Sequence, residues 1–202
     1  MTTPLRTFRS TLLCSTLVAL APAGLLAAQM QMPMPQGPVS DHGKSVDGKP
    51  LASPAAEAST SLAGKTITIL YNSPSMRGRA IMGGVVPYGQ VWRTGANPAT
   101  SFVTEGNLKI GDLMVPAGSY TLYTLPAAPG TPWMLIVNKQ TGQWGTVYKP
   151  EMDLGRSPMH TDKLASPQEM MTITFEKPMK NTVELNEKWE TTDQWGKIDA
   201  AK

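Results

Sequence analysis

From residue 65 onward the chain alternates short apolar-rich segments with turn residues, and this rhythm is the feature that most limits its fold. Residues 66–71 and 119–125 alternate polar and apolar side chains, which is typical of half-buried strands. Glycine, proline and asparagine separate such segments, and no window of a dozen residues carries a helical apolar stripe. We therefore expect an all-β, single-domain antiparallel β-sandwich or small barrel of seven to nine short strands.

Other segments fit the same interpretation. Residues 170–175 and 182–185 are expected to form a C-terminal hairpin around 178–181, which a strand at 188–191 would extend. Further strands are expected at 100–104, 108–110 and 133–137.

The first 28 residues have the layout of a secretory signal peptide. Arg6 and Arg9 precede an uncharged apolar run that ends in the small-residue pair Ala27-Ala28, a suitable cleavage site. An uncleaved membrane anchor is the alternative, but polar residues and a proline interrupt the run, which is marginal for crossing a bilayer. We expect a periplasmic or secreted protein with no stable membrane insertion after signal cleavage.

Cleavage would change the charge and the cysteine content. Loss of Arg6 and Arg9 leaves 16 of the 18 basic residues against 15 acidic ones, a net charge of +1. A nearly neutral surface gives no electrostatic reason to expect a nucleic-acid partner. The only cysteine, Cys14, would also be lost, so a hydrophobic core rather than a disulfide must stabilise the fold.

Residues 29–63 are expected to form a disordered linker rich in Pro, Met and Ser, followed by the β domain at 64–202. Met30, Met32 and Met34 alternate with other residues ahead of His42, and thioethers are soft ligands that suit Cu(I). Chance methionines in a flexible leader are the alternative interpretation. Because the linker offers no defined ligand spacing, no metal site is predicted.

Familiar catalytic patterns are missing from the sequence. It contains no G-x-S-x-G elbow and no H-x-x-x-H or H-E-x-x-H metal spacing. His160 lies among polar residues and is expected to be a solvated histidine in a connection. No cofactor is predicted, no catalytic residue is selected, and neither enzymatic activity nor an oligomeric state is predicted.

The segment 58–104 contains no aspartate or glutamate, yet it carries Arg77, Arg79 and Arg93. The planar guanidinium fork suits carboxylates and phosphates, and it is costly to bury without partners. These arginines therefore need acids from the C-terminal half, backbone carbonyls or an anionic ligand.

The most irregular stretch of the chain, residues 83–98, lies inside this acid-free segment. Its aromatic and amide side chains would add stacking faces and hydrogen bonds to the arginines, a mixture typical of a small-ligand site. The alternative is structural, with the tryptophan filling the core and the arginine binding loop carbonyls. The predicted ligand-binding residues are Arg77, Arg79, Tyr88, Trp92, Arg93, Asn97 and Trp144.

A five-residue pattern occurs twice in the chain. Residues 141–145 and 192–196 both have the sequence T-x-Q-W-G. Two copies without matching flanks do not establish a repeat, so we interpret the echo as coincidence.

Four motifs resemble a family of exported bacterial proteins known only as a domain of unknown function, number twenty-nine-eleven. They are S-P-S-x-R-G-R at 73–79, G-G-x-V-P-Y-G-x-V-W-R-T-G-A-N at 83–97, V-P-A-G-x-Y at 115–120 and N-x-x-T-G-Q-W-G at 138–145. The resemblance covers residues 65–191 and implies an exported single domain with no established activity. The family usually ends on an alternating strand after a Trp-Glu pair, whereas the residues after Trp189-Glu190 depart from that alternation.

Three functions are compatible with these observations. The first is an exported β-sandwich module that binds a small anionic or sugar-like (carbohydrate) ligand at the arginine and aromatic loop. The second is a hydrolase of envelope glycans that uses carboxylates such as Glu151, Asp153 or Glu169 beside Arg93. The third is a non-catalytic structural or interaction protein of the cell envelope.

Overall fold

The computed structural model describes residues 51–202. The expected signal peptide and the methionine tail from Met30 to His42 lie outside these residues. Within 51–202, no helix is long and apolar enough to be a membrane span.

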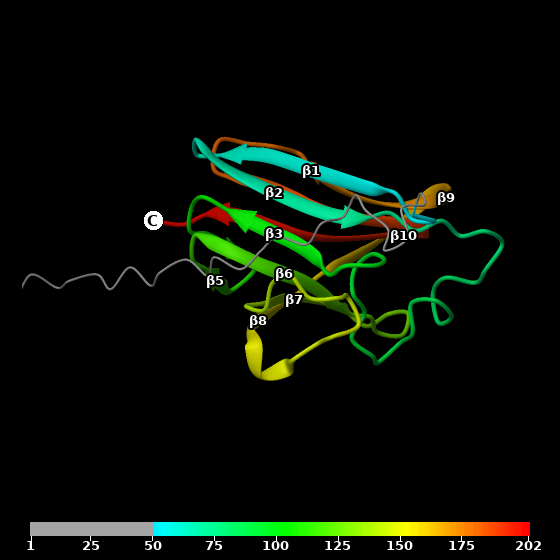
Figure 1. Cartoon of the computed structure of the whole chain (residues 1–202). Coiled ribbons are helices and arrows are strands. Elements are labelled where there is room, and N and C mark those ends of the chain that lie inside the picture. The colour runs from blue at the N-terminus through cyan, green and yellow to red at the C-terminus, as the bar shows by residue number, and fades with distance from the viewer. Residues whose placement is uncertain (1–50) are drawn as a thin grey trace, which may run out of the picture. The chain divides into compact units, whose positions relative to one another are not determined.

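Ten strands in this part of the chain form two open, antiparallel sheets, so the all-β sandwich is confirmed (Figure 1). The first sheet has the order β1-β2-β3-β6-β7-β8, with β1 (Ala55–Leu62), β2 (Lys65–Asn72), β3 (Thr100–Thr104), β6 (Gly118–Leu125), β7 (Met134–Asn138) and β8 (Asp153–Pro158). The second has the order β5-β4-β10-β9, with β5 (Leu113–Val115), β4 (Leu108–Ile110), β10 (Thr182–Ala200) and β9 (His160–Glu176). A short 3-10 helix, η1 (Pro150–Met152), precedes β8.

The described residues form ten strands, whereas seven to nine were expected, because the sequence pattern did not predict β1, β5 and β8. β1 lies inside the expected linker, and its small side chains bury only Ala58 and Leu62, which gives a weak apolar pattern. Ala63 and Gly64 nevertheless join it to β2 in a two-residue turn with positive φ at both positions, the geometry that suits a tight hairpin. β8 is an edge strand that contains Gly155 and ends at Pro158, as edge strands tolerate.

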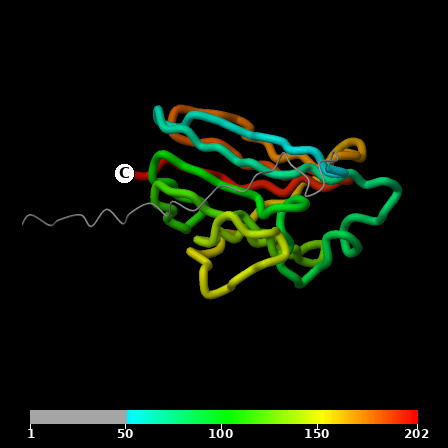
Figure 2. The backbone as a smooth tube through the Cα atoms, in the orientation of Figure 1, coloured from blue at the N-terminus to red at the C-terminus, as the bar shows by residue number. Residues whose placement is uncertain are grey.

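β10 turns back on itself. The Ala200 amide donates to the Asn181 carbonyl at 2.8 Å, and the Thr182 hydroxyl donates to the Asp199 carboxylate at 2.6 Å. A straight strand advances about 3.3 Å per residue, so these groups can meet only if the chain reverses between them. Glu190, whose φ is +54°, lies at the midpoint, where the pairing with β9 also shifts register. In Figure 2 the red end of the chain runs back beside the orange segment before it.

The second arm of β10 pairs with β4, with Ile198 opposite Ile110. The final strand therefore forms despite its irregular alternation. The reversal brings polar side chains of the two arms into contact. The Asn186 side-chain amide donates to the Asp193 carboxylate at 3.1 Å. His160 lies in β9 rather than in a connection, and its ring stacks on Trp195 with centroids 4.3 Å apart.

The core lies between the two sheets and consists of aliphatic and aromatic side chains from both. The largest of its fully buried members are Trp189, Phe102, Leu62, Ile67, Ile69, Ile81, Leu108 and Ile110. Burial of this apolar surface is the main force that stabilises a domain without disulfides.

Glu187 is a buried acid inside this core, on the first arm of β10 between Leu185 and Trp189. It is 7% exposed, and its Oε2 atom has no hydrogen-bond partner. It lines a cavity of about 10 Å³ together with Thr94 and Met159. Burial, reinforced by the negative charge of Asp193, raises the pKa of Glu187 to about 8. The folded protein therefore keeps this carboxyl protonated at neutral pH.

We expect the wild-type free energy of unfolding to fall as the pH rises from about 4.5 to about 8. In this window the unfolded chain releases the Glu187 proton and the folded chain retains it, so Glu187 alone contributes a loss of up to about 1.4 kcal/mol per pH unit. Glu187→Gln keeps the shape and removes the titration, so urea denaturation across this range should show a shallower slope.

Glu57→Gln is the control, because Glu57 is exposed on β1 and its replacement should leave the wild-type slope in place. Equal slopes for wild type and Glu187→Gln would contradict a protonated, buried Glu187.

Candidate functional site

The loop at residues 73–99 joins β2 to β3 and carries the most specific of the recognised motifs. A connection of this length without strands of its own is uncommon in a compact domain and usually has a function. Its first residues pair with β9, since the Met76 amide donates to the Glu169 carbonyl at 2.8 Å and Ser75 forms a bridge with Met170. Ile81 and Val86 are fully buried, so the loop has its own apolar anchors.

Trp92 is the largest apolar anchor of the loop. It is 7% exposed, and its ring stacks on Trp189 with centroids 6.0 Å apart and planes inclined by 21°. Its backbone forms a two-way bridge with Thr124, with N–H···O distances of 2.8 and 3.0 Å. Trp92 therefore fills the core and cannot offer a stacking face to a ligand at the surface.

Thr94 follows Trp92 in an unfavourable backbone conformation. Its φ is +53°, which a β-branched residue rarely adopts. The surroundings hold it there, because its hydroxyl donates to Thr124 Oγ1 at 3.2 Å and its carbonyl accepts from the Thr100 hydroxyl at 2.7 Å. Such strained residues cluster at functional sites when packing over-determines them, and here they fix the course of the loop.

Arg77 and Arg79 lie on the exposed first half of the loop. Arg77 donates from Nη2 to the Ala52 carbonyl at 2.6 Å. Arg79 donates from Nε to the Met76 carbonyl at 3.0 Å and from Nη2 to the Ser75 carbonyl at 2.7 Å. Both guanidinium groups therefore bind backbone carbonyls, one of the three partners expected from the sequence.

Arg93 and Asn97 lie together farther along the loop. Arg93 is half-buried, donates from Nε to the Gly95 carbonyl at 3.2 Å, and has its pKa lowered by burial. The Asn97 carbonyl accepts from the Gly145 amide at 3.0 Å. Gly145 leaves room for this contact, since a Cβ atom there would lie 2.5 Å from Arg93 Cδ and 2.8 Å from the Asn97 oxygen.

Acids from the C-terminal hairpin hold the same loop through its backbone. Glu169 Oε1 accepts from the Arg77 amide at 2.9 Å, and Glu190 Oε2 accepts from the Met82 amide at 3.3 Å. Carboxylates of β9 and β10 therefore bind the acid-free segment, but they accept hydrogen bonds from its backbone amides and not from its guanidinium groups. Glu190 was not singled out from the sequence.

Asp153 belongs to a separate polar group at the edge of the first sheet. Its carboxylate accepts from Tyr148 at 2.7 Å, from Arg156 at 3.0 Å and from Asn138 at 2.9 Å. Burial, the hydrogen bond to Asp153 and the charge of Asp153 raise the pKa of Tyr148 to about 12. Asp153 is therefore fully engaged in structural contacts.

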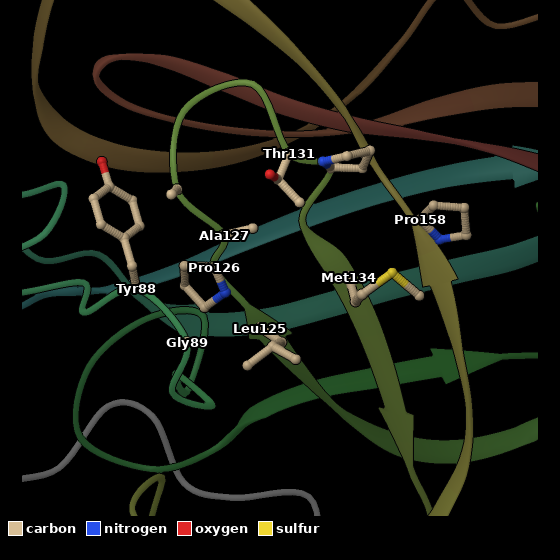
Figure 3. Close-up of a pocket in the computed structure, with 10 residues that line it drawn as sticks. Tyr88, Gly89, Leu125, Pro126, Ala127, Thr131, Met134 and Pro158 are labelled. Carbon is tan, nitrogen blue, oxygen red and sulfur yellow. The ribbon is translucent and has the colours of Figure 1, made fainter.

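Tyr88 is the predicted site residue that lines a pocket. It is 37% exposed and borders a cavity of about 770 Å³, the Tyr88 pocket (Figure 3). Leu125 and Pro126 lie between Tyr88 on one side and Met134 and Pro158 on the other. The full lining is Tyr88, Gly89, Leu125, Pro126, Ala127, Ala128, Thr131, Pro132, Met134 and Pro158.

A second cavity of about 150 Å³, the Gln194 pocket, adjoins the first. The two share Tyr88, Ala127, Ala128 and Thr131. The remaining lining residues of the Gln194 pocket are Met82, Pro129, Gly130, Trp133, Thr161, Thr192 and Gln194. Among residues 51–202, no aspartate, glutamate, lysine or arginine lines either pocket.

Gln194 is the notable residue that sequence reasoning missed. It is 1% exposed, and the only sequence signal that pointed to it was the repeated T-x-Q-W-G pattern. The first copy places Gln143 at a half-buried position, where its Nε2 donates to Thr121 and Tyr123 at 3.1 Å. The second copy places Gln194 at a pocket.

Trp144 lies apart from both pockets. Its side chain is 50% exposed, and its backbone forms a bridge with Pro98. The structure therefore gathers Arg93, Asn97 and the neighbourhood of Trp144 at one place and Tyr88 at another. Within residues 51–202, no group of three His, Cys, Asp or Glu side chains is arranged to hold a metal ion.

Gly145→Ala tests the close packing of the Arg93 and Asn97 region. The added Cβ atom would meet a backbone oxygen that cannot move freely, so we expect a loss of about 1 to 3 kcal/mol in the free energy of unfolding by urea denaturation. Gly196→Ala is the matched control, because nothing lies within 4 Å of its Cβ position and stability should change little. Equal effects of the two substitutions would contradict the packing described.

Comparison with known proteins identifies the family of the chain. No curated protein and no solved structure matches the chain. Residues 53–197, which include the whole loop and both pockets, match the family described as "Protein of unknown function (DUF2911)". The family expected from the sequence is confirmed, and the chain belongs to this family of unknown function.

Proposed function

We propose that this protein is an exported β-sandwich module that binds a small ligand with an apolar surface in the Tyr88 pocket. One observation carries the proposal. Tyr88, an exposed aromatic residue of the recognised motif, borders a large apolar pocket that the adjoining strands and loops build. Export is proposed from Arg6, Arg9 and the apolar run that follows them.

The chemistry of the lining supports an apolar ligand. Leu125, Pro126, Met134 and Pro158 present aliphatic atoms, and the volume of about 770 Å³ lies in the range typical of small-molecule sites. Proline and strand residues hold the walls in a fixed conformation, which lowers the entropic cost of binding. Tyr88 adds an aromatic face and a hydroxyl group, so it can both stack on a ligand and orient it.

The proposed class of ligand is narrower than the class expected from the sequence. The expected anionic or sugar-like ligand relied on arginines, but Arg77, Arg79 and Arg93 donate to backbone carbonyls and none of them lines the pocket. An apolar face that stacks on Tyr88 is compatible with a carbohydrate ring or an aromatic ring. It gives no partner for an anion.

No observation favours the hydrolase alternative. Glu151, Asp153 and Glu169 line neither pocket, and the last two make structural hydrogen bonds. A glycosidase would need two carboxyl groups facing the same ligand. Likewise, no particular observation favours a purely structural role in the envelope.

Binding of N-phenyl-1-naphthylamine, a neutral probe whose fluorescence rises in apolar surroundings, tests the proposal. We expect saturable binding to the wild-type protein. Met134→Glu places a charge in the Tyr88 pocket, where it costs free energy without a partner, and should weaken binding at least about tenfold.

Met114→Glu is the matched control, because Met114 is 52% exposed on β5 and lines neither pocket. Its binding should equal that of the wild type. The absence of saturable binding to wild type, or equal binding by the two glutamate variants, would refute the proposed site.

A further inference from the structure

We propose that the ligand is a neutral amphiphile whose carbonyl-type head group accepts a hydrogen bond from Gln194 Nε2 in the Gln194 pocket. Its apolar part would occupy the adjoining Tyr88 pocket. This inference rests on the proposed function and specifies the chemistry of the ligand at that site.

The first support is an unpaired donor. Gln194 is 1% exposed, yet its Nε2 atom has no hydrogen-bond partner in the described part of the chain. A buried amide without a partner is costly, and native structures contain few of them. The other end of the same amide is fixed, because Oε1 accepts from the Thr161 hydroxyl at 2.9 Å. The orientation thus leaves the N–H donor of a cavity-lining residue without a partner among residues 51–202.

The second support is the neutral lining. Thr131, Thr161, Thr192 and Tyr88, which carry neutral hydroxyl groups, line the cavity together with apolar side chains. No charged side chain of residues 51–202 lines it, so an ionic head group would lose its hydration without gaining a counter-charge. An uncharged acceptor, such as a ketone, ester or amide carbonyl, matches an N–H donor without this cost.

The third support is the arrangement of the two cavities. They share Tyr88, Ala127, Ala128 and Thr131, so one ligand can extend from one into the other. The smaller cavity, about 150 Å³, has room for a head group of a few atoms. The larger cavity, about 770 Å³, has room for the apolar part. A cavity lined in part by polar side chains beside a larger apolar cavity suits an amphiphile.

A matched pair of compounds tests the inference. Butyrophenone and butylbenzene have nearly the same size, but only butyrophenone carries a carbonyl. Each is titrated against the complex of the full-length protein with N-phenyl-1-naphthylamine. We expect the ketone to bind roughly threefold to tenfold more tightly, the effect of one buried hydrogen bond. 4-Phenylbutyrate should bind more weakly than butyrophenone, because its carboxylate would have no cationic partner.

Variants assign the preference to Gln194. Gln194→Met keeps the length of the side chain and removes the amide, so the preference for the ketone should disappear. Thr161→Val removes the hydroxyl that orients the amide and should reduce the preference, and Thr161→Ser should restore it. Gln140→Met is the control, since Gln140 also has a buried unpaired oxygen but lines neither pocket, and it should retain the preference.

The outcomes separate the two proposals. If the probe binds wild type but butyrophenone and butylbenzene displace it equally, a water already satisfies Gln194 and the inference fails while the binding site stands. Tightest binding of 4-phenylbutyrate, or an undiminished ketone preference in a folded Gln194→Met variant, would also overturn the inference alone. Failure of the probe to bind wild type refutes the proposed function itself.

Discussion

The stack of Trp92 on Trp189 fixes the long loop to the reversal of β10, and the rest of the candidate site depends on it. The two rings lie 6.0 Å apart in the core, and Trp189 precedes Glu190, where the chain turns with a positive φ. The Met82 amide donates to the Glu190 carboxylate, so the reversal of β10 holds the loop at a second point. Burial of Trp92 fixes the position of the loop. The loop then holds Thr94 in a backbone conformation that would otherwise be unfavourable.

This anchoring directs most polar groups of the loop toward the protein itself. Arg77, Arg79 and Arg93 donate to nearby carbonyls, while Glu169 and Glu190 accept from loop amides. Such contacts satisfy a long connection that would otherwise leave many backbone groups without partners. Among residues 51–202, no charged side chain lines the two pockets beside the loop.

Strands with strong alternation of polar and apolar residues could be predicted from the sequence, whereas strands with weak alternation could not. Residues 66–71 and 119–125 gave β2 and β6, but β1 buries only two small or aliphatic side chains and so resembled a linker. For the site, the sequence identified the correct loop but not the roles within it. That Trp92 faces the core depends on its contact with Trp189, which lies on a strand distant in the sequence. Gln194 could not be selected, because its unpaired amide exists only in the folded protein.

The loop holds its arginines to the backbone and leaves Tyr88 and Gln194 beside open cavities. A ¹H–¹⁵N NMR titration of the full-length protein with butyrophenone tests this arrangement most directly. The side-chain amide of Gln194 should shift on binding, together with the backbone amides of Gly89 and Thr131 in the pocket walls. Shifts centred on Arg79 or Trp144, with the Gln194 amide unchanged at saturation, would contradict it.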